Sequence, residues 1–240
     1  DLVGYTATFA IAGVLTATGM LPPLLVPDHI PLLAGREPKR RIGILRAIST
    51  HRRLLAKVGI IPMLVMTVRE GRLVVIPLIG DDLGLSSSAV GAVVTVGTAA
   101  DLMLFPVAGW VMDRFGRLAA MIPAFGLIAC GLVALGMANG TPLVVAAGAI
   151  IGIGNGLCSG TMLTLGSDVA PPEAPGQFLA GLATMQEGGR VAGPLLVGAM
   201  GAAYGLGAAA YALALVLVVA IVWLVLIVGE TGRQRVDIVG

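Results

Sequence analysis

Seven long apolar stretches dominate this sequence, and they constrain its fold more than any other feature. Each approaches or exceeds the length of about 20 residues that a helix needs to cross the hydrocarbon core of a bilayer. Hydrophobic residues make up 57% of the 240 positions and charged residues only 12%, whereas a soluble domain carries about 25% charged residues. The sequence therefore predicts an all-α integral membrane protein with seven transmembrane helices, over residues 3–25, 55–79, 88–112, 118–137, 143–165, 178–203 and 206–228.

The polar segments divide the chain into four predicted parts. Residues 1–25 hold the first helix, 26–54 form a basic loop, 55–229 form a bundle of six helices, and 230–240 form a tail. The chain begins at Asp1 and enters an apolar stretch at once, without the charged first region of a signal peptide. We therefore interpret it as a fragment of a longer protein.

Lysine and arginine predict the orientation of the helices. Of the 15 such residues, three lie inside predicted spans, and the others fall in the 26–54 loop and its edge, in the turn after the third stretch, or in the tail. Seven successive crossings place these segments on one side, which the positive-inside rule makes the cytoplasm. We expect an N-terminus outside, a C-terminus inside and a multi-pass protein of the cell membrane. The loop at 167–176 is an exception, because Asp168 and Glu173 make it acidic.

A polar turn joins the third and fourth stretches, and it carries Gly109, Asp113, Arg114, Gly116 and Arg117 at fixed spacing. The pattern G-x-x-x-D-R-x-G-R resembles the loop signature of the major facilitator superfamily, where it recurs in each half of the molecule. The resemblance implies two six-helix bundles that rock about a central site, with this loop helping to hold the cytoplasmic side closed. Together with the basic loop, it implies that the chain is the C-terminal half, a six-helix bundle plus one preceding helix. The missing N-terminal half would then be its partner.

The sixth stretch contains Gly189, Gly193 and Pro194. Small residues let membrane helices approach closely, and a proline removes one backbone hydrogen bond and can bend a helix. The segment is also similar to the glycine–proline motif of antiporters in this family. Tight packing with a kink and a hinge used in transport are both consistent with these residues.

Ionisable and amide side chains lie near the middle of several predicted spans. Each charge costs a few kcal/mol at the bilayer centre, so these residues must face a polar cavity or one another. They either neutralise each other and fix helix register or form a midplane site for substrate and protons. The candidate pathway comprises Arg69, Glu70, Arg72, Asp101, Asn155, Gln186, Glu187 and Arg190.

Two of these carboxylates are the candidates for proton coupling. Asp101 has no cation at helical spacing on its own span, so its partner must come from another helix. Glu187 lies three residues from Arg190 and can pair within its own helix. We therefore rank Asp101 first and Glu187 second. The balance of three acids and three arginines allows complete pairing in one conformation.

Other functional classes find little support in the sequence. It has no basic stripe with interleaved aromatic residues for nucleic acid, no glycine-rich phosphate loop and no metal-ligand spacing. We expect no enzyme activity, no metal and no cofactor; a membrane-embedded enzyme or a channel is the rival class. The resemblance implies a small-molecule substrate, protons and the lipid bilayer as partners. We expect a secondary active transporter that exports small organic molecules by proton coupling, with uptake of a sugar or organic acid as the alternative.

Overall fold

The structure is a computed structural model that describes residues 10, 13, 14, 17, 18 and 50–229. The chain divides into two units, Asp1–Arg41 and Ile42–Gly240. The predicted span at 3–25, the basic loop at 26–54 and the tail at 230–240 lie wholly or largely outside the described residues.

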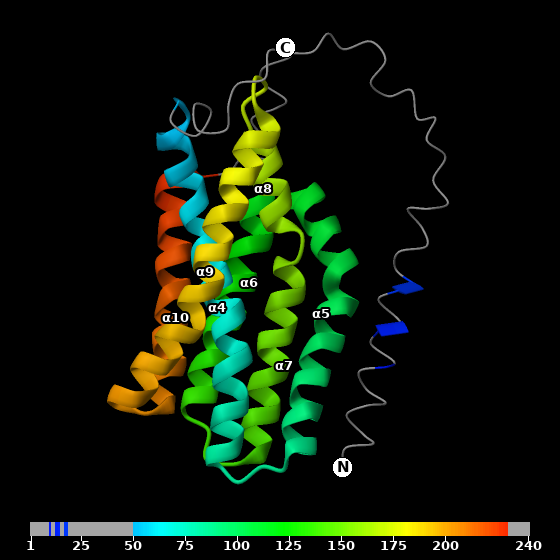
Figure 1. Ribbon diagram of the computed structural model, residues 1–240. Coiled ribbons are helices and arrows are strands. Elements are labelled where there is room, and N and C mark those ends of the chain that lie inside the picture. The colour runs from blue at the N-terminus through cyan, green and yellow to red at the C-terminus, as the bar shows by residue number, and fades with distance from the viewer. Residues whose placement is uncertain (1–9, 11–12, 15–16, 19–49, 230–240) are drawn as a thin grey trace. The chain divides into compact units, whose positions relative to one another are not determined.

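Helices account for almost all of residues 50–229 (Figure 1). Long apolar stretches separated by short turns favour this outcome, because a helix satisfies its own backbone hydrogen bonds. No strand occurs among the described residues, and the predicted all-α membrane fold is confirmed. In chain order the helices are α4 (Arg52–Asp82), α5 (Ser87–Phe115), α6 (Arg117–Gly136), α7 (Thr141–Cys158), α8 (Thr161–Val169), α9 (Pro175–Tyr204) and α10 (Leu206–Trp223), followed by a π-helix at Leu224–Val228.

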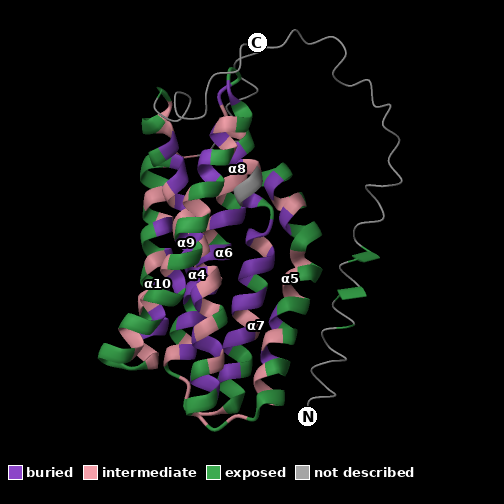
Figure 2. Ribbon diagram, in the orientation of Figure 1, coloured by how far each residue is buried: buried purple, intermediate pink, exposed green. Residues whose placement is uncertain are grey.

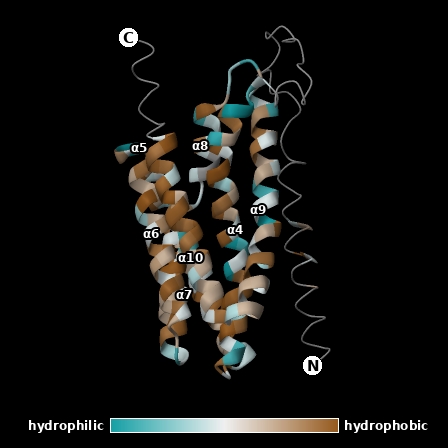
Figure 3. Cartoon of the chain, turned by 90° about the vertical axis from the view of Figure 1, so that its left-hand side faces the viewer, coloured by the Kyte–Doolittle hydropathy of each residue, from teal (hydrophilic) through white to brown (hydrophobic). Residues whose placement is uncertain are grey.

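Four helical segments of the described chain are long and apolar enough to cross a membrane: α5, α6, α7 and the run from α10 through the π-helix. Figure 3 shows hydrophobic residues along most of the helices, with hydrophilic ones near the ends and midway along α4 and α9. These midway positions carry the predicted charges, among them Glu70 on α4 and Arg190 on α9.

The bundle packs around α4, α6 and α7. Helix α4 contacts α9 and α10, α7 contacts α5 and α6, and α6 also contacts α10. Buried residues concentrate on the faces where these helices meet (Figure 2). Large buried side chains such as Phe125, Ile151 and Leu213 fill this core. By contrast, α5 buries only four of its residues, so most of its surface has no partner within this bundle.

The fifth predicted span, 143–165, is not one continuous helix, and this expectation was wrong. Helix α7 ends at Cys158, Ser159 is extended, and α8 begins at Thr161. Gly160 has φ +83°, a left-handed conformation that glycine adopts without steric cost. The break changes the direction of the backbone between α7 and α8.

The turns between helices fall at two ends of the bundle (Figure 1). The start of α4, the turn at Gly116, the loop between α8 and α9 and the end of α10 lie at one end. The turns that follow α4, α6 and α9 lie at the other. At this second end, the Ser86 hydroxyl accepts a hydrogen bond from the Ala89 backbone N–H over 3.3 Å and caps α5, as expected for a serine before an apolar helix.

Candidate transport site

Asp101 on α5 lies against α7, where two neutral groups donate hydrogen bonds to it. The Asn155 amide donates to one carboxylate oxygen, and the Ser159 hydroxyl donates to the other over 2.8 Å. Asn155 is almost completely buried, at 1% exposed. No ion pair of Asp101 occurs within the part of the chain that the structure describes, so this carboxylate is held by neutral partners.

Glycines on α7 bring Asp101 this close. A Cβ atom at Gly156 would lie 2.7 Å from the Asp101 carbonyl oxygen, and one at Gly152 would lie 2.6 Å from the Gly97 Cα atom on α5. Gly148 continues the same face, against Val93. Such a row of glycines allows two membrane helices to pack backbone to backbone. Gly160, which sequence spacing places in the same row, instead turns the chain between α7 and α8.

Arg190 joins the two glutamates of the predicted pathway. Its guanidinium lies 3.2 Å from Glu70 on α4 and 3.0 Å from Glu187 on its own helix. The pairing within α9 follows from the three-residue spacing. The pairing with α4 gives Glu70 a partner that the sequence did not identify. One arginine thus pairs with two carboxylates among the described residues, so this conformation is not one in which each acid has its own arginine.

Arg69 and Arg72 consequently make no ion pair within the described residues. The Arg72 side chain lies between α4, α5 and α7, and its buried Nε atom has no hydrogen-bond acceptor. It lies within electrostatic range of Asp101, Glu70 and Arg69. Two positive charges in the middle of the bundle are therefore compensated only at longer range.

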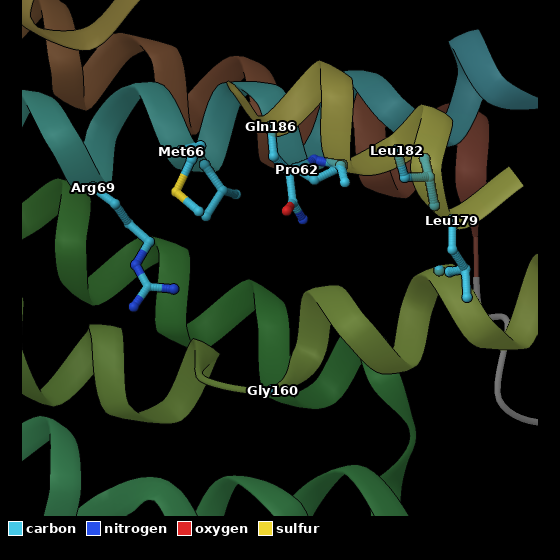
Figure 4. A pocket seen from close by; sticks show the side chains of 10 residues that line it. Pro62, Met66, Arg69, Gly160, Leu179, Leu182 and Gln186 are labelled. Carbon is cyan, nitrogen blue, oxygen red and sulfur yellow. The ribbon is translucent and has the colours of Figure 1, made fainter. Parts of the chain in front are cut away.

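Arg69 and Gln186 line a pocket of about 280 Å³ between α4, α8 and α9. Figure 4 shows both side chains, together with Met66, pointing toward the open space, with Gly160 across from them. The rest of the lining is largely apolar, including Val65 and Leu182. The eight predicted pathway residues therefore fall into three groups. Asp101 and Asn155 form the first, with Arg72 nearby, and Arg190 holds Glu70 and Glu187 in the second. The third, Arg69 and Gln186, lines this pocket.

The polar turn after α5 is built on Gly116, which has φ +98° and separates α5 from α6. Arg117 follows it and forms an ion pair of 2.9 Å with Asp168 on α8. It also donates a hydrogen bond to the Met112 carbonyl oxygen over 3.2 Å. Asp168 was predicted to lie in the acidic loop at 167–176, but it lies in the last turn of α8, and from there it supplies a partner for the basic turn.

The other members of this turn point outward. Arg114 lies over the Trp110 ring, with 5.8 Å between its guanidinium carbon and the ring centroid, a cation–π distance. Asp113 is exposed, and Gly109 has open space where a Cβ atom would lie. The structure thus leaves the Asp113 side chain on the surface of the bundle.

Gly189 and Gly193 on α9 pack against the backbone of α4. A Cβ atom at Gly189 would collide with the Met63 carbonyl oxygen, and one at Gly193 would lie 2.8 Å from the Gly71 backbone nitrogen. Pro194 lies inside α9, which continues past it to Tyr204. These glycines set the close contact that brings Arg190 to Glu70.

The sequence did not identify Ser159 as a partner of Asp101 or Asp168 as a partner of Arg117. A signal exists for Ser159, because it lies four residues after Asn155 and so near the same helix face. Within the described residues, no three His, Cys, Asp or Glu side chains come together in a way that could hold a metal ion.

The fold and these charges define the class of protein: a multi-pass helical membrane protein with a polar site between its helices. Residues 58–237 match the Major Facilitator Superfamily. Because the match covers most of the chain, this protein belongs to that family, which consists of transporters and not of enzymes. No curated protein matches the chain.

Proposed function

We propose that this chain forms the C-terminal half of a proton-coupled transporter of the cell membrane that exports small organic molecules. Support for a missing second bundle comes from Glu187 and Arg190, whose side chains are 62% and 49% exposed. Charged side chains near the middle of a membrane-spanning helix cannot face lipid at low cost. A second bundle, with a polar cavity between the two, would cover them and leave them accessible to substrate.

The exposed face of α5 fits the same arrangement. Leu102, Met103 and Trp110 are all more than half exposed in this bundle, and Asp113 lies at the end of the same helix. A second bundle packed on this face would bring a partner to Asp113, whose carboxylate is favoured near a helix N-terminus. Because alternating access requires two bundles, we expect this chain alone to show no uptake or efflux.

Asp101 carries the proton in this proposal. An ionised carboxylate in the membrane interior must find a cation or take up a proton, and among the described residues Asp101 makes side-chain hydrogen bonds only to neutral groups. The buried Oδ1 atom of Asn155 has no donor. A rotation of the Asn155 amide by 180° would place this oxygen against Asp101, where a protonated carboxyl could donate to it. The Asn155 and Ser159 side chains can therefore serve both protonation states.

Infrared difference spectroscopy on the chain in lipid tests this assignment without knowledge of the substrate. Lowering the pH should produce the carbonyl band of a protonated carboxyl, and Asp101→Asn should remove that band. The matched control is Asp82→Asn at the end of α4, which is exposed and should leave the band in place. An unchanged band in Asp101→Asn would show that another group takes up the proton.

A second candidate, uptake of an organic acid together with a proton, is favoured by Arg69 and Arg72, which pair with no carboxylate among the described residues. An anion near Asp101 disfavours the ionised carboxylate, so anion and proton would bind together and move in the same direction. Export by antiport requires the opposite, competition between substrate and proton. The effect of pH on substrate affinity therefore separates the two candidates.

A further inference from the structure

We propose that the pocket between α4, α8 and α9 binds a small organic monoanion, with its negative group on Arg69. This inference rests on the proposed transport function only in taking the pocket as part of the substrate path. Arg69 and Gln186 supply hydrogen-bond donors on one part of the wall, while Val65, Leu179 and Leu182 supply an apolar surface on another. Figure 4 shows Arg69, Gln186, Leu179 and Leu182 around one open space.

Arg69 is the group that selects a negative charge. Its guanidinium makes no ion pair within the described residues, unlike that of Arg190, which holds both Glu70 and Glu187. A guanidinium presents a planar fork of donors that matches a carboxylate in two hydrogen bonds. An entering anion would therefore supply the charge that the bundle itself does not place beside Arg69.

Two further donors reinforce this preference. The Gln186 side chain can donate from its amide nitrogen. Gly160, at the N-terminal end of α8, also lines the pocket, and the partial positive charge at a helix N-terminus favours an anion. No carboxylate lines this pocket among the described residues, so nothing there compensates Arg69 or repels an anion.

The pocket limits both the charge and the size of the ligand. Arg72, which also makes no ion pair among the described residues, lines a separate and smaller pocket between α4, α5 and α7. Arg69 is therefore the one cation that the described lining of the anion pocket supplies, and a single negative charge fits. The volume of about 280 Å³ lies just below the range of about 300–1,000 Å³ for sites that bury drug-sized ligands. A compact acid with an apolar body, such as an aromatic monocarboxylate, satisfies both limits.

Three ligands of nearly the same shape test the charge preference directly. We would titrate the detergent-purified chain at pH 7.5 with benzoate, the neutral benzamide and the cationic benzamidine, and measure binding by calorimetry. Charge-assisted hydrogen bonds contribute about 1.5–3 kcal/mol, so benzoate should bind at least about tenfold more tightly than benzamide. Benzamidine should bind most weakly. Equal affinities for benzoate and benzamide would overturn the proposal, and so would no binding of benzoate.

Variants then place the anion at Arg69. Arg69→Gln should reduce benzoate affinity about tenfold or more and leave the weak affinity for benzamide unchanged, whereas Arg69→Lys should retain part of the benzoate affinity. The matched control is Arg53→Gln, an exposed position at the start of the same helix, which should bind benzoate as the wild type does. If Arg69→Gln and Arg53→Gln bind benzoate equally well, the anion is not bound at Arg69.

These measurements distinguish failure of this inference from failure of the proposed function. Binding in detergent requires no gradient, so Asp101→Asn should still bind benzoate even though it lacks the carboxylate proposed to carry the proton. Conversely, the infrared band of Asp101 can be present when benzoate does not bind, and that result would reject the anion pocket alone.

Discussion

Asp101 accepts a hydrogen bond of 2.8 Å from Ser159, the residue that follows the end of α7. The break at this point is therefore part of the site, because it directs the hydroxyl toward a carboxylate on α5. A hydrogen bond to a charged group contributes about 1.5–3 kcal/mol. In the full-length transporter, Ser159→Ala should raise the pH midpoint of transport, because the ionised carboxylate loses a hydrogen bond.

The control for this shift is Ser167→Ala on α8, because the Ser167 hydroxyl donates only to the Thr164 carbonyl oxygen of its own helix. We would measure the initial rate of transport against pH for the wild type and both variants. A midpoint that is the same in all three would contradict a role for Ser159 in proton uptake.

The ion pair of Arg117 and Asp168 should stabilise the end of the bundle that contains the basic turn. Both side chains are less than one-fifth exposed, so the pair is stronger than one on an open surface. We expect Asp168→Asn to lower the free energy of unfolding in micelles by about 1–2 kcal/mol. Glu173→Gln is the control, since Glu173 is an exposed acid after the same helix. Equal stability of the two variants would show that the ion pair contributes nothing measurable.

The contact between α5 and α7 should tolerate no added methyl group. Gly152→Ala would place a Cβ atom 2.6 Å from the Gly97 Cα atom, and overpacking of this kind costs about 1–3 kcal/mol. Gly91→Ala on α5 is the control, because no atom lies within 4 Å of its Cβ position and alanine favours a helix by about 0.5–1 kcal/mol. Thermal unfolding in micelles should rank Gly91→Ala above the wild type and Gly152→Ala below it; the reverse order would contradict the observed packing.

The sequence predicted the positions of the helices better than the contacts between them. The apolar length of residues 88–112 sufficed to predict α5, because crossing a bilayer fixes a minimum length. The pairing of Glu187 with Arg190 followed from spacing within one helix. Glu70 and Arg190 lie on different helices, so their pairing depends on the relative rotation of α4 and α9. Spacing within one helix says nothing of that rotation.

The break at Ser159 and Gly160 could not be predicted for a related reason. Both residue types occur inside continuous membrane helices, and only the packed neighbours decide whether a glycine there adopts a left-handed conformation. The sequence therefore predicted Asp101 and Asn155 as site residues but not the hydroxyl that completes their network.

The distribution of lysine and arginine in the sequence predicts the orientation in the membrane. Asp82, the last residue of α4, and Glu173, in the loop between α8 and α9, are both exposed. Figure 1 shows the end of α4 and this loop at opposite ends of the bundle. In a background without Cys130 and Cys158, a cysteine at residue 82 should react with an impermeant thiol reagent from outside the cell. One at residue 173 should react only after permeabilisation. Labelling of both from the same side would contradict the predicted topology.

The most direct test of the central proposal is pH-driven transport by the full-length transporter with Asp101 replaced by Asn. This variant keeps the shape of the side chain but cannot carry a proton. Reconstituted in liposomes, it should show no substrate movement in response to a pH gradient, while exchange of labelled for unlabelled substrate across the membrane continues. Full pH-driven transport by Asp101→Asn, combined with an Arg69→Ala variant that only lowers protein yield, would show that these charges are structural.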